Sequence, residues 1–363
     1  MTETIKTVFI LGAGASKQAG VPLMREFLDV ARDLRRVGRV GVHAADFERV
    51  FQALSDLQVV QSKARFDLVN IETIFSAFEF ARVIQSFCGY NNDQIAALAN
   101  AAKNVIAHTI EETLRFPLGA DGPIAPRPYA KFANLVKALT KSASPVHRPA
   151  IITFNYDFAL DFVFRDVQID FGLGEQGDSR SLISLLKLHG SVNWARCAVC
   201  GEIRQVRFQD FVKDRGVIDR IDVFRFGHSL NLQSHCHTRV DPQPVIVPPS
   251  WNKTAHHEQL SHVWSAVARE LAAADNIIII GYSLPDTDMF FRQLYALGTV
   301  GPRLLERVWV FDPDESGIVR RRFEELLGRG AEQRFRFFQE TFDPAISHVA
   351  KEFHVSASNL QAQ

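Results

Sequence analysis

The chain has 363 residues, of which 47% are hydrophobic and 23% are charged, the balance of an ordinary globular protein. Its 41 basic and 41 acidic residues cancel, so no overall field favours nucleic acid or an anionic membrane surface. The N-terminal residues do not match a signal peptide, the apolar runs are too short to span a bilayer, and four cysteines without an export signal do not indicate a disulfide framework. These features predict a cytoplasmic protein with one main domain and an insertion, or with two domains.

The first predicted strand, Thr7–Leu11, is a short apolar run that leads into Gly12-Ala13-Gly14-Ala15-Ser16. From Met24 to about Ser142 the apolar spacing becomes helical, with Asn70 as a predicted N-cap and a Pro/Gly loop at Pro117–Pro128. The predicted helices are Leu23–Val37, Ala44–Leu57, Ile71–Phe87, Asp93–Phe116 and Tyr129–Thr140, and Cys88 is expected to be buried.

Short apolar runs, typical of strands buried on both faces, return after residue 149. The predicted strands are Ala150–Phe154, Leu185–His189, Val245–Val247, Asn276–Ile280, Val308–Phe311 and Phe335–Phe338. Helices are predicted between several of them, at His256–Ala274, Asp286–Leu297 and Ser316–Leu327. This alternation predicts an α/β fold with a Rossmann-like, doubly wound and mostly parallel sheet.

The predicted domain organisation is discontinuous. The sheet domain comprises residues 1–22, 145–190 and 245–345, with a helical insertion at 23–144. A polar segment at 191–244 contains three of the four cysteines and is expected to form a small module, and 346–363 is expected to be a C-terminal tail.

The glycine turn after the first strand predicts a phosphate site within Val8–Pro22, with NAD as the expected ligand. Gly12 and Gly14 allow the backbone to approach a pyrophosphate at the start of a helix. The third glycine of a dehydrogenase fingerprint is replaced by Lys17, and no second strand ending in an acid follows about 20 residues on. A hydride-transfer enzyme is therefore disfavoured.

Polar residues or glycines also follow four other predicted strands, at the edge where ligands bind in open α/β sheets. Each has an ordinary structural explanation when taken alone: Asn155 could cap the next helix, and His189 could be a structural histidine. Taken together they favour a binding site. The residues are Asn155, Asp157, His189, Gly281, Ser283 and Asp312.

The motifs GAGAS with GVP, TFNYD, KLHGS, CxxC and GYSLPDTD stand in the order found in the sirtuin family. The chain resembles most closely the sirtuin-like domains of bacterial anti-phage defence systems. The resemblance implies that Gly12, Ala13, Gly14 and Ser16 hold the NAD pyrophosphate, that Gly281 and Ser283 support the phosphates, and that Asp312 lies near the adenosine ribose. It further implies that Arg25 lies near the nicotinamide, that Asn155 and Asp157 position the nicotinamide ribose and the attacking group, and that His189 is the base on that ribose.

The sequence also departs from the sirtuin pattern. Phe154 replaces a glutamine, and Leu23 and Met24 replace an Asp-Phe pair. Deacylating sirtuins clamp their peptide with a Phe-Gly-Glu segment, whereas this chain has PVIVPPSW at 244–251. Prolines cannot donate ladder hydrogen bonds, so peptide capture by strand addition is disfavoured.

Cys197, Cys200 and Cys236 resemble part of a zinc ribbon. Arg239 stands where the fourth cysteine is expected, and His235 or His237 could complete the set. A ribbon that has lost its metal is the alternative. Any zinc here is expected to be structural.

The leading hypothesis is an NAD glycohydrolase that releases ADP-ribose and nicotinamide. The resemblance implies an abortive-infection effector, restrained as a homo-oligomer or by a partner such as an ATPase or an Argonaute-type sensor, without direct nucleic-acid binding. The alternatives are an NAD-dependent protein-lysine deacylase and a non-catalytic module that senses NAD or ADP-ribose.

Overall fold

The computed structural model describes residues 4–59, 67–117, 119–120, 123–141, 146–173, 183–205, 212–218, 221–227, 234–241, 243–247, 257–286, 288–300 and 303–361. The chain divides into two compact units. The first unit comprises Met1–Ala19, Phe116–Gly190 and Trp251–Gln363, and the second comprises Gly20–Arg115 and Ser191–Ser250.

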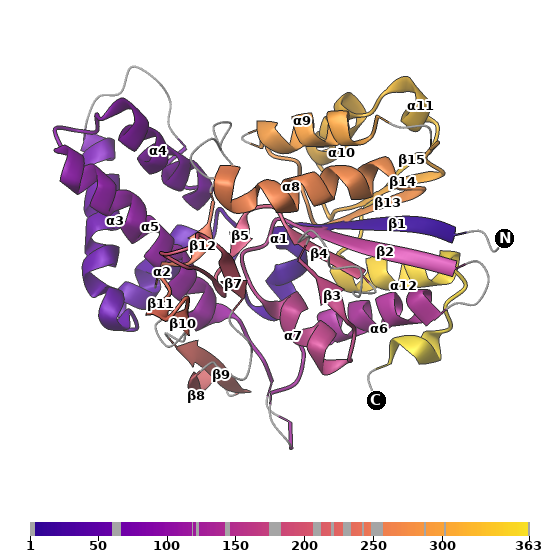
Figure 1. Cartoon of the computed structure of the whole chain (residues 1–363), viewed down its shortest axis with the longest axis horizontal. Coiled ribbons are helices and arrows are strands. Elements are labelled where there is room, and N and C mark those ends of the chain that lie inside the picture. The colour runs from indigo at the N-terminus through magenta and orange to yellow at the C-terminus, as the bar shows by residue number, and fades with distance from the viewer. Residues whose placement is uncertain are drawn as a thin grey trace. The chain divides into compact units, whose positions relative to one another are not determined.

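The first unit is built on a seven-stranded sheet in the order β15-β14-β13-β1-β2-β4-β3, in which all neighbours run parallel (Figure 1). The predicted Rossmann-like, doubly wound fold is therefore confirmed. The strands are β1 (Thr4–Leu11), β2 (Val146–Thr153), β3 (Phe171–Gly172), β4 (Ile183–Lys187), β13 (Asn276–Ile280), β14 (Arg307–Phe311) and β15 (Phe335–Phe338).

Strand β1 lies at the centre of the sheet, where the strand order changes direction. Its last residue, Leu11, is in register with Thr153 on one side and with Ile280 on the other. The loops that follow β1, β2 and β13 therefore emerge side by side at the carboxyl edge. In open α/β sheets this switch point is the usual ligand site.

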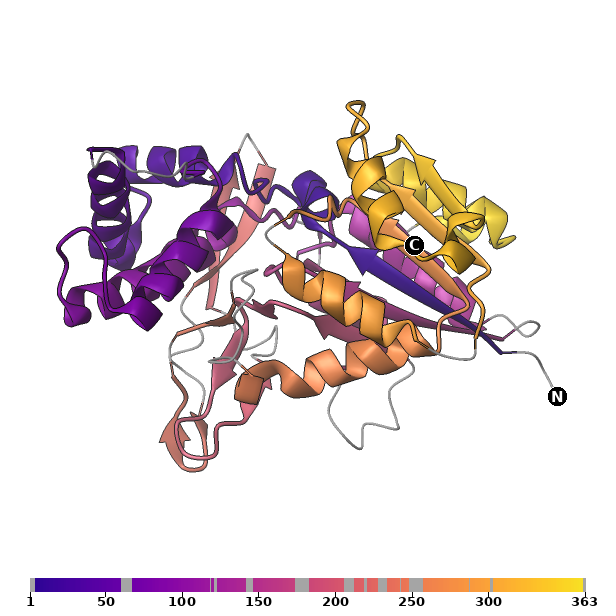
Figure 2. The same ribbon diagram turned by 90° about the horizontal axis from the view of Figure 1, so that it is seen from above.

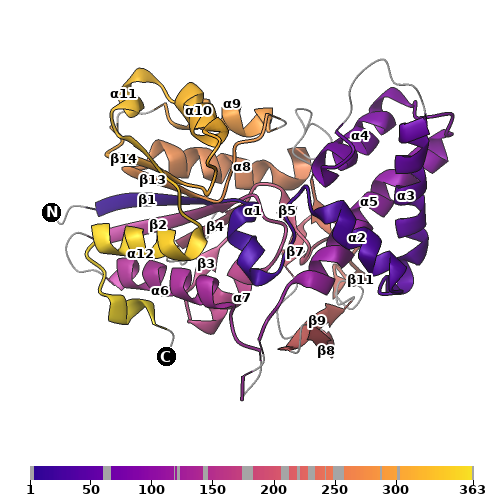
Figure 3. The same cartoon turned by 180° about the vertical axis from the view of Figure 1, so that it is seen from behind.

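Helices cover both faces of this sheet. On one face α6 (Arg127–Lys141), α7 (Ala159–Asp166) and α12 (Phe342–Glu352) pack together (Figure 3). On the other face α8 (His257–Ala272) lies beside α9 (Met289–Gly298), both in orange in Figure 2. The remaining helical elements of the first unit are α1 (Ala13–Ser16), η1 (Lys17–Ala19), α10 (Ile318–Leu326), α11 (Arg329–Glu332) and η6 (Ala357–Leu360).

Aromatic packing between α6, α12 and the sheet explains why α6 belongs to the first unit. The Phe132 ring lies 5.3 Å from Phe9 of β1 and 5.7 Å from Phe342 of α12. Burial of such rings stabilises this layer by about 2 kcal/mol for each side chain. The sequence predicts α6 as part of the helical insertion and a C-terminal tail from residue 346, which lies inside α12.

The second unit contains helices and short strands. The helices are α2 (Phe27–Arg36), η2 (Gly41–His43), α3 (Ala44–Val59), α4 (Ile71–Ile84) and α5 (Asn92–Thr113). The strands are β6 (Trp194–Arg196), β7 (Ile203–Gln205), β8 (Val212–Ile218), β9 (Ile221–Gly227), β10 (Ser234–His235), β11 (Thr238–Arg239) and β12 (Val245–Ile246), while β5 (Gly190–Ser191) stands at the boundary between the units.

The boundaries of α4 test two predictions. Asn70 is its N-cap, because the side chain accepts a hydrogen bond from the Glu72 N–H at 2.9 Å. The helix ends at Ile84 rather than Phe87, at a left-handed Gln85. Cys88 therefore lies beyond the helix and is exposed, so the prediction that it is buried is wrong. No helix in the described part of the chain combines the length and hydropathy needed to cross a bilayer.

Candidate functional site

The glycine loop after β1 interlocks with the loop after β13. The Gly14 N–H donates to the Gly281 carbonyl oxygen at 2.9 Å. A Cβ on Gly12 would lie 2.5 Å from that same oxygen, and a Cβ on Gly14 would lie 2.8 Å from the Gly281 Cα. Gly281 itself has φ +64°, in the left-handed region that favours glycine. These three glycines are therefore required by the contact between two loops, whether or not a ligand is present.

Asn155 ties the end of β2 to the glycine loop. Its side-chain Nδ2 donates to the Gly12 carbonyl oxygen at 2.9 Å, and its backbone N–H donates to Thr153 Oγ1 at 3.1 Å. The N-cap of the helix that follows is Phe158, and Asp157 Oδ1 accepts from the N–H of its first residue, Ala159, at 2.9 Å. The alternative in which Asn155 caps this helix is thus not the observed arrangement.

A buried polar network links Asp157 to Ser16, the last residue of α1. Ser16 Oγ donates to Asp157 Oδ2 at 2.6 Å and lies 2.9 Å from the Tyr129 hydroxyl. Burial raises the pKa of the Asp157 carboxyl, although the Lys187 charge and the Ser16 hydrogen bond act in the opposite direction. Both carboxylate oxygens of Asp157 accept hydrogen bonds from within the protein, Oδ1 from the Ala159 N–H and Oδ2 from the Ser16 hydroxyl.

Lys187, the last residue of β4, completes this network and is fully buried. Its Nζ donates to the Asp157 carbonyl oxygen at 2.7 Å and lies 2.6 Å from Asp161 Oδ2. An ammonium and a carboxylate can be buried together because each compensates the other. Neither Lys187 nor Tyr129 is predicted from the sequence as a site residue, although Lys187 is the first residue of the KLHGS motif.

His189 follows β4 and is only 2% exposed. Its ring lies 5.3 Å from the Phe154 ring, edge to face. Phe154 in turn stacks on Tyr282, with ring centroids 3.8 Å apart and planes 5° apart. Aromatic side chains from the loops after β2 and β13 thus meet above the end of β1 and shield the imidazole from water.

His189 Nε2 lies 3.8 Å from Oδ2 of Asp288, a buried residue that precedes α9. The Tyr282 hydroxyl donates to the same oxygen at 2.7 Å. Neither Tyr282 nor Asp288 is predicted from the sequence as a site residue, yet both belong to the GYSLPDTD motif.

The remaining strand-end candidates also follow the carboxyl edge of the sheet. Ser283 is exposed, and its carbonyl oxygen accepts from Arg322 Nη1 at 3.3 Å. Asp312 follows β14, and its Oδ1 accepts from the Asp314 N–H at 3.0 Å. Burial raises the pKa of the Asp312 carboxyl. Ala13 is half-buried in the glycine loop.

Arg25 belongs to the second unit. Its side chain is 79% exposed and lies 3.8 Å from the Asp67 carboxylate. Its position near a bound nicotinamide stays a prediction.

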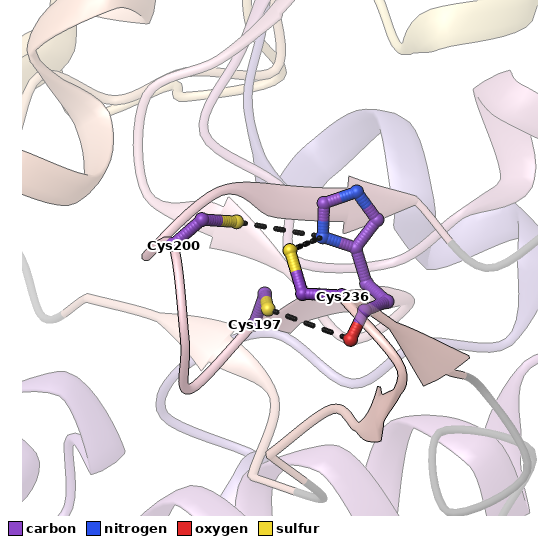
Figure 4. A group of neighbouring side chains, drawn as sticks. Cys197, Cys200 and Cys236 are labelled. Atoms are coloured by element: carbon purple, nitrogen blue, oxygen red, sulfur yellow. Dashed lines mark hydrogen bonds between the residues drawn. The ribbon is translucent and has the colours of Figure 1, made fainter.

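The predicted cysteines converge with one histidine in the second unit (Figure 4). The potential ligand atoms of Cys197, Cys200, His235 and Cys236 all lie within 4.8 Å of one another. The Cys200 and Cys236 sulfurs are each 3.4 Å from His235 Nδ1. Ligands around a tetrahedral zinc are separated by about 3.8 Å, so this Cys3His set fits a structural zinc.

The ionisation of one cysteine, Cys197, also fits a metal site, whereas the hydrogen bond to the Cys200 sulfur raises the pKa of the Cys236 thiol to about 11. Hydrogen bonds, the largest from the Cys200 N–H, lower the pKa of the Cys197 thiol to about 6. A thiolate is the form that binds zinc. His235, rather than His237, completes the four-ligand group.

No protein-family model and no curated protein matches the sequence. Among solved structures the chain is similar to a Sir2 homologue in complex with NAD, with 15% identity, coverage of 95% of this chain and 90% of that chain, and a TM-score of 0.39. It is also similar to a variant of a Sir2 homologue with ADP-ribose, at 14% identity over 96% of this chain and 94% of that chain, with a TM-score of 0.42. A third similar structure is Sir2 with a p53 peptide and NAD+, at 14% identity over 97% of this chain and 94% of that chain, with a TM-score of 0.39. At such identities and TM-scores the similarity concerns at most the fold and carries no information on activity.

Proposed function

We propose that this chain is an NAD glycohydrolase, which cleaves NAD to ADP-ribose and nicotinamide. The observation that carries the proposal is the grouping of Asn155 and His189. They follow the adjacent strands β2 and β4, and Asn155 is hydrogen-bonded to the glycine loop at the switch point of the sheet. A carboxamide and an imidazole at that edge are suited to activate water beside a bound dinucleotide.

Binding of NAD is assigned to residues that follow three strands, β1, β13 and β14, and to one arginine. Backbone N–H groups of the loop after β1 would meet the pyrophosphate charge. Asp312 would accept hydrogen bonds from the adenosine ribose hydroxyls, and Arg25 would lie at the nicotinamide end. The proposed binding residues are Gly12, Ala13, Gly14, Ser16, Arg25, Gly281, Ser283 and Asp312.

The proposed reaction breaks the bond between nicotinamide and C1 of its ribose. The bonding electron pair leaves with nicotinamide and neutralises the positive charge of its ring. Asn155 orients a water whose oxygen attacks C1, and His189 accepts the proton that is released. Burial of both side chains strengthens their electrostatic interactions with the developing charge.

Asp157 acts in this scheme by holding the site together. Its two carboxylate oxygens accept from Ser16 and from the first turn of α7, and so join the glycine loop to the Asn155 loop. A shift of about 1 Å in such a constellation costs orders of magnitude in rate. We therefore propose for Asp157 a positioning role.

Two alternatives predict different requirements. A protein-lysine deacylase would release nicotinamide only with an acylated peptide. The two prolines that argue against peptide capture, Pro248 and Pro249, lie outside the described residues. A sensor of NAD or ADP-ribose would bind without turnover, but a pure binder has no need of both Asn155 and His189.

The motif resemblance to defence proteins supports a role in abortive infection, in which loss of NAD stops phage growth. Such an activity needs restraint before infection. We propose that this restraint comes from a homo-oligomer or from a partner, such as an ATPase or an Argonaute-type sensor. The Cys3His cluster is proposed to hold a structural zinc, because four protein ligands leave no open position for substrate.

The test is nicotinamide release from NAD by the purified chain, with and without an acetylated lysine peptide and, where the genome supplies one, with the partner. Release without peptide is the expected result. Release only with peptide would establish the deacylase instead. Binding of NAD without release under all conditions, including with the partner, would establish the sensor.

A further inference from the structure

A buried carboxylate lies at the start of α9, in the second half of the GYSLPDTD motif. Asp288 is 1% exposed, and its Oδ1 accepts from the Phe291 N–H at 3.4 Å. The other acid of the motif, Asp286, is exposed and pairs with Arg292 and Arg322. Since burying a carboxylate is costly unless partners compensate it, the inner acid needs an explanation that the outer one does not.

The partners of Asp288 come from two loops at the carboxyl edge. Its Oδ2 accepts from the Tyr282 hydroxyl at 2.7 Å and lies 3.8 Å from His189 Nε2. Tyr282 follows β13 and His189 follows β4, so the carboxylate joins strand ends on opposite sides of β1. Capping α9 requires only one carboxylate oxygen, and the other is directed to the proposed base.

The other described groups around His189 are mainly aromatic or are engaged elsewhere. Phe154 contacts the imidazole edge to face, and the Tyr156 ring lies 6.0 Å from it. The nearby ammonium of Lys187 is bound to Asp161 and to the Asp157 carbonyl oxygen. From α8, the Trp264 indole N–H donates to the Leu188 carbonyl oxygen at 3.1 Å and fixes the backbone next to His189.

We infer that Asp288 is the positioning residue for His189: its carboxylate, held by Tyr282, orients the imidazole and stabilises its protonated form. A negative charge 3.8 Å away in a water-poor environment favours the imidazolium. The inference rests on the proposed function for its catalytic meaning. In that reaction His189 takes the proton of the attacking water, and Asp288 makes it a stronger base without touching NAD.

The pairing can be tested without turnover, by histidine NMR. The full chain is labelled with 15N-histidine, and the His189 signal is identified by its loss in His189→Ala. The pH midpoint of this signal is then measured for the wild type and for D288N, which keeps the size and the capping oxygen of the aspartate. We expect the midpoint in D288N to fall by about one pH unit. The matched control D286N removes the exposed acid of the same motif and should leave the midpoint unchanged.

A folded D288N with the wild-type midpoint would overturn the inference, as would a wild-type His189 that stays neutral from pH 5 to 9. If D288N does not fold, Y282F removes only the hydrogen bond to the carboxylate and should shift the same midpoint; an unchanged midpoint in Y282F would then count against the inference.

The kinetic measurement addresses the catalytic meaning. In D288N the kcat for nicotinamide release should fall at least tenfold with the KM for NAD unchanged, and the acid limb of the pH–rate profile should move to lower pH. A chain that shows the NMR shift but never cleaves NAD would refute the proposed function and leave the pairing established. Cleavage without the NMR shift would refute the pairing alone.

Discussion

Replacing Gly12 by alanine separates two reasons for a glycine at this position. An added Cβ would meet the Gly281 carbonyl oxygen and the Tyr282 Cα, each at 2.5 Å, and the Tyr282 Cβ at 2.7 Å. These distances are well inside van der Waals contact, and two of the three atoms belong to the backbone. The loop cannot move aside freely, because the Gly281 N–H donates to the Phe311 carbonyl oxygen at 2.9 Å. We expect G12A to lower the free energy of unfolding by about 3 kcal/mol.

The assay is urea and thermal unfolding of G12A beside G330A. Gly330 lies in α11 with no atom within 4 Å of an added Cβ, so alanine is tolerated there. A loss of about 3 kcal/mol corresponds to a fall in Tm of about 10 °C for a unit of this size. The packing explanation is refuted if G12A is as stable as G330A. Stability combined with loss of NAD binding would instead show that the glycine serves only the approach of a ligand.

Three further predictions concern the metal cluster and buried charges. Metal analysis after a chelator wash should find one zinc per chain in the wild type and almost none in C236S. The control C88S, which replaces an exposed cysteine outside the cluster, should match the wild type. A zinc content well below one per chain in the wild type would contradict a structural site. K187M should cost about 3–5 kcal/mol in urea unfolding, because it leaves the Asp161 carboxylate buried without its cation, and a neutral effect would refute this account of the pair. Burial raises the pKa of Glu111 to about 8, so folding binds a proton that the unfolded chain releases above its usual pKa. The free energy of unfolding of the wild type should therefore fall relative to that of E111Q by about 4 kcal/mol between pH 4.5 and 8.5. A difference between the two proteins that does not change with pH would count against this account.

The sheet could be predicted from the sequence where strands are continuous apolar runs. The bounds of β13 and β15 match the predicted ones because Asn276–Ile280 and Phe335–Phe338 carry strong strand patterns of their own. Strand β3 was missed since two residues, Phe171 and Gly172, leave no periodicity to detect. Helix ends were less accurate: α2 begins at Phe27 rather than Leu23, after a turn whose residues are equally compatible with a helix.

The site could be predicted only as far as strand order determines it. Asn155 and His189 follow adjacent parallel strands, so their nearness follows from topology. Tyr129, Lys187 and Asp288 act through side-chain contacts between segments far apart in the chain, and no spacing in the sequence encodes such contacts. For Lys187 and Asp288 the only available signal was their place in the KLHGS and GYSLPDTD motifs, and Tyr129 lies in no motif.

The central claim is tested most directly by the products that purified wild-type protein forms from NAD alone. The account predicts equal amounts of nicotinamide and ADP-ribose, lost in folded N155A and H189A but kept in N359A and H354N, which replace an asparagine and a histidine exposed in the same unit. Full activity in either folded N155A or H189A, or nicotinamide release that requires an acylated peptide, would contradict it.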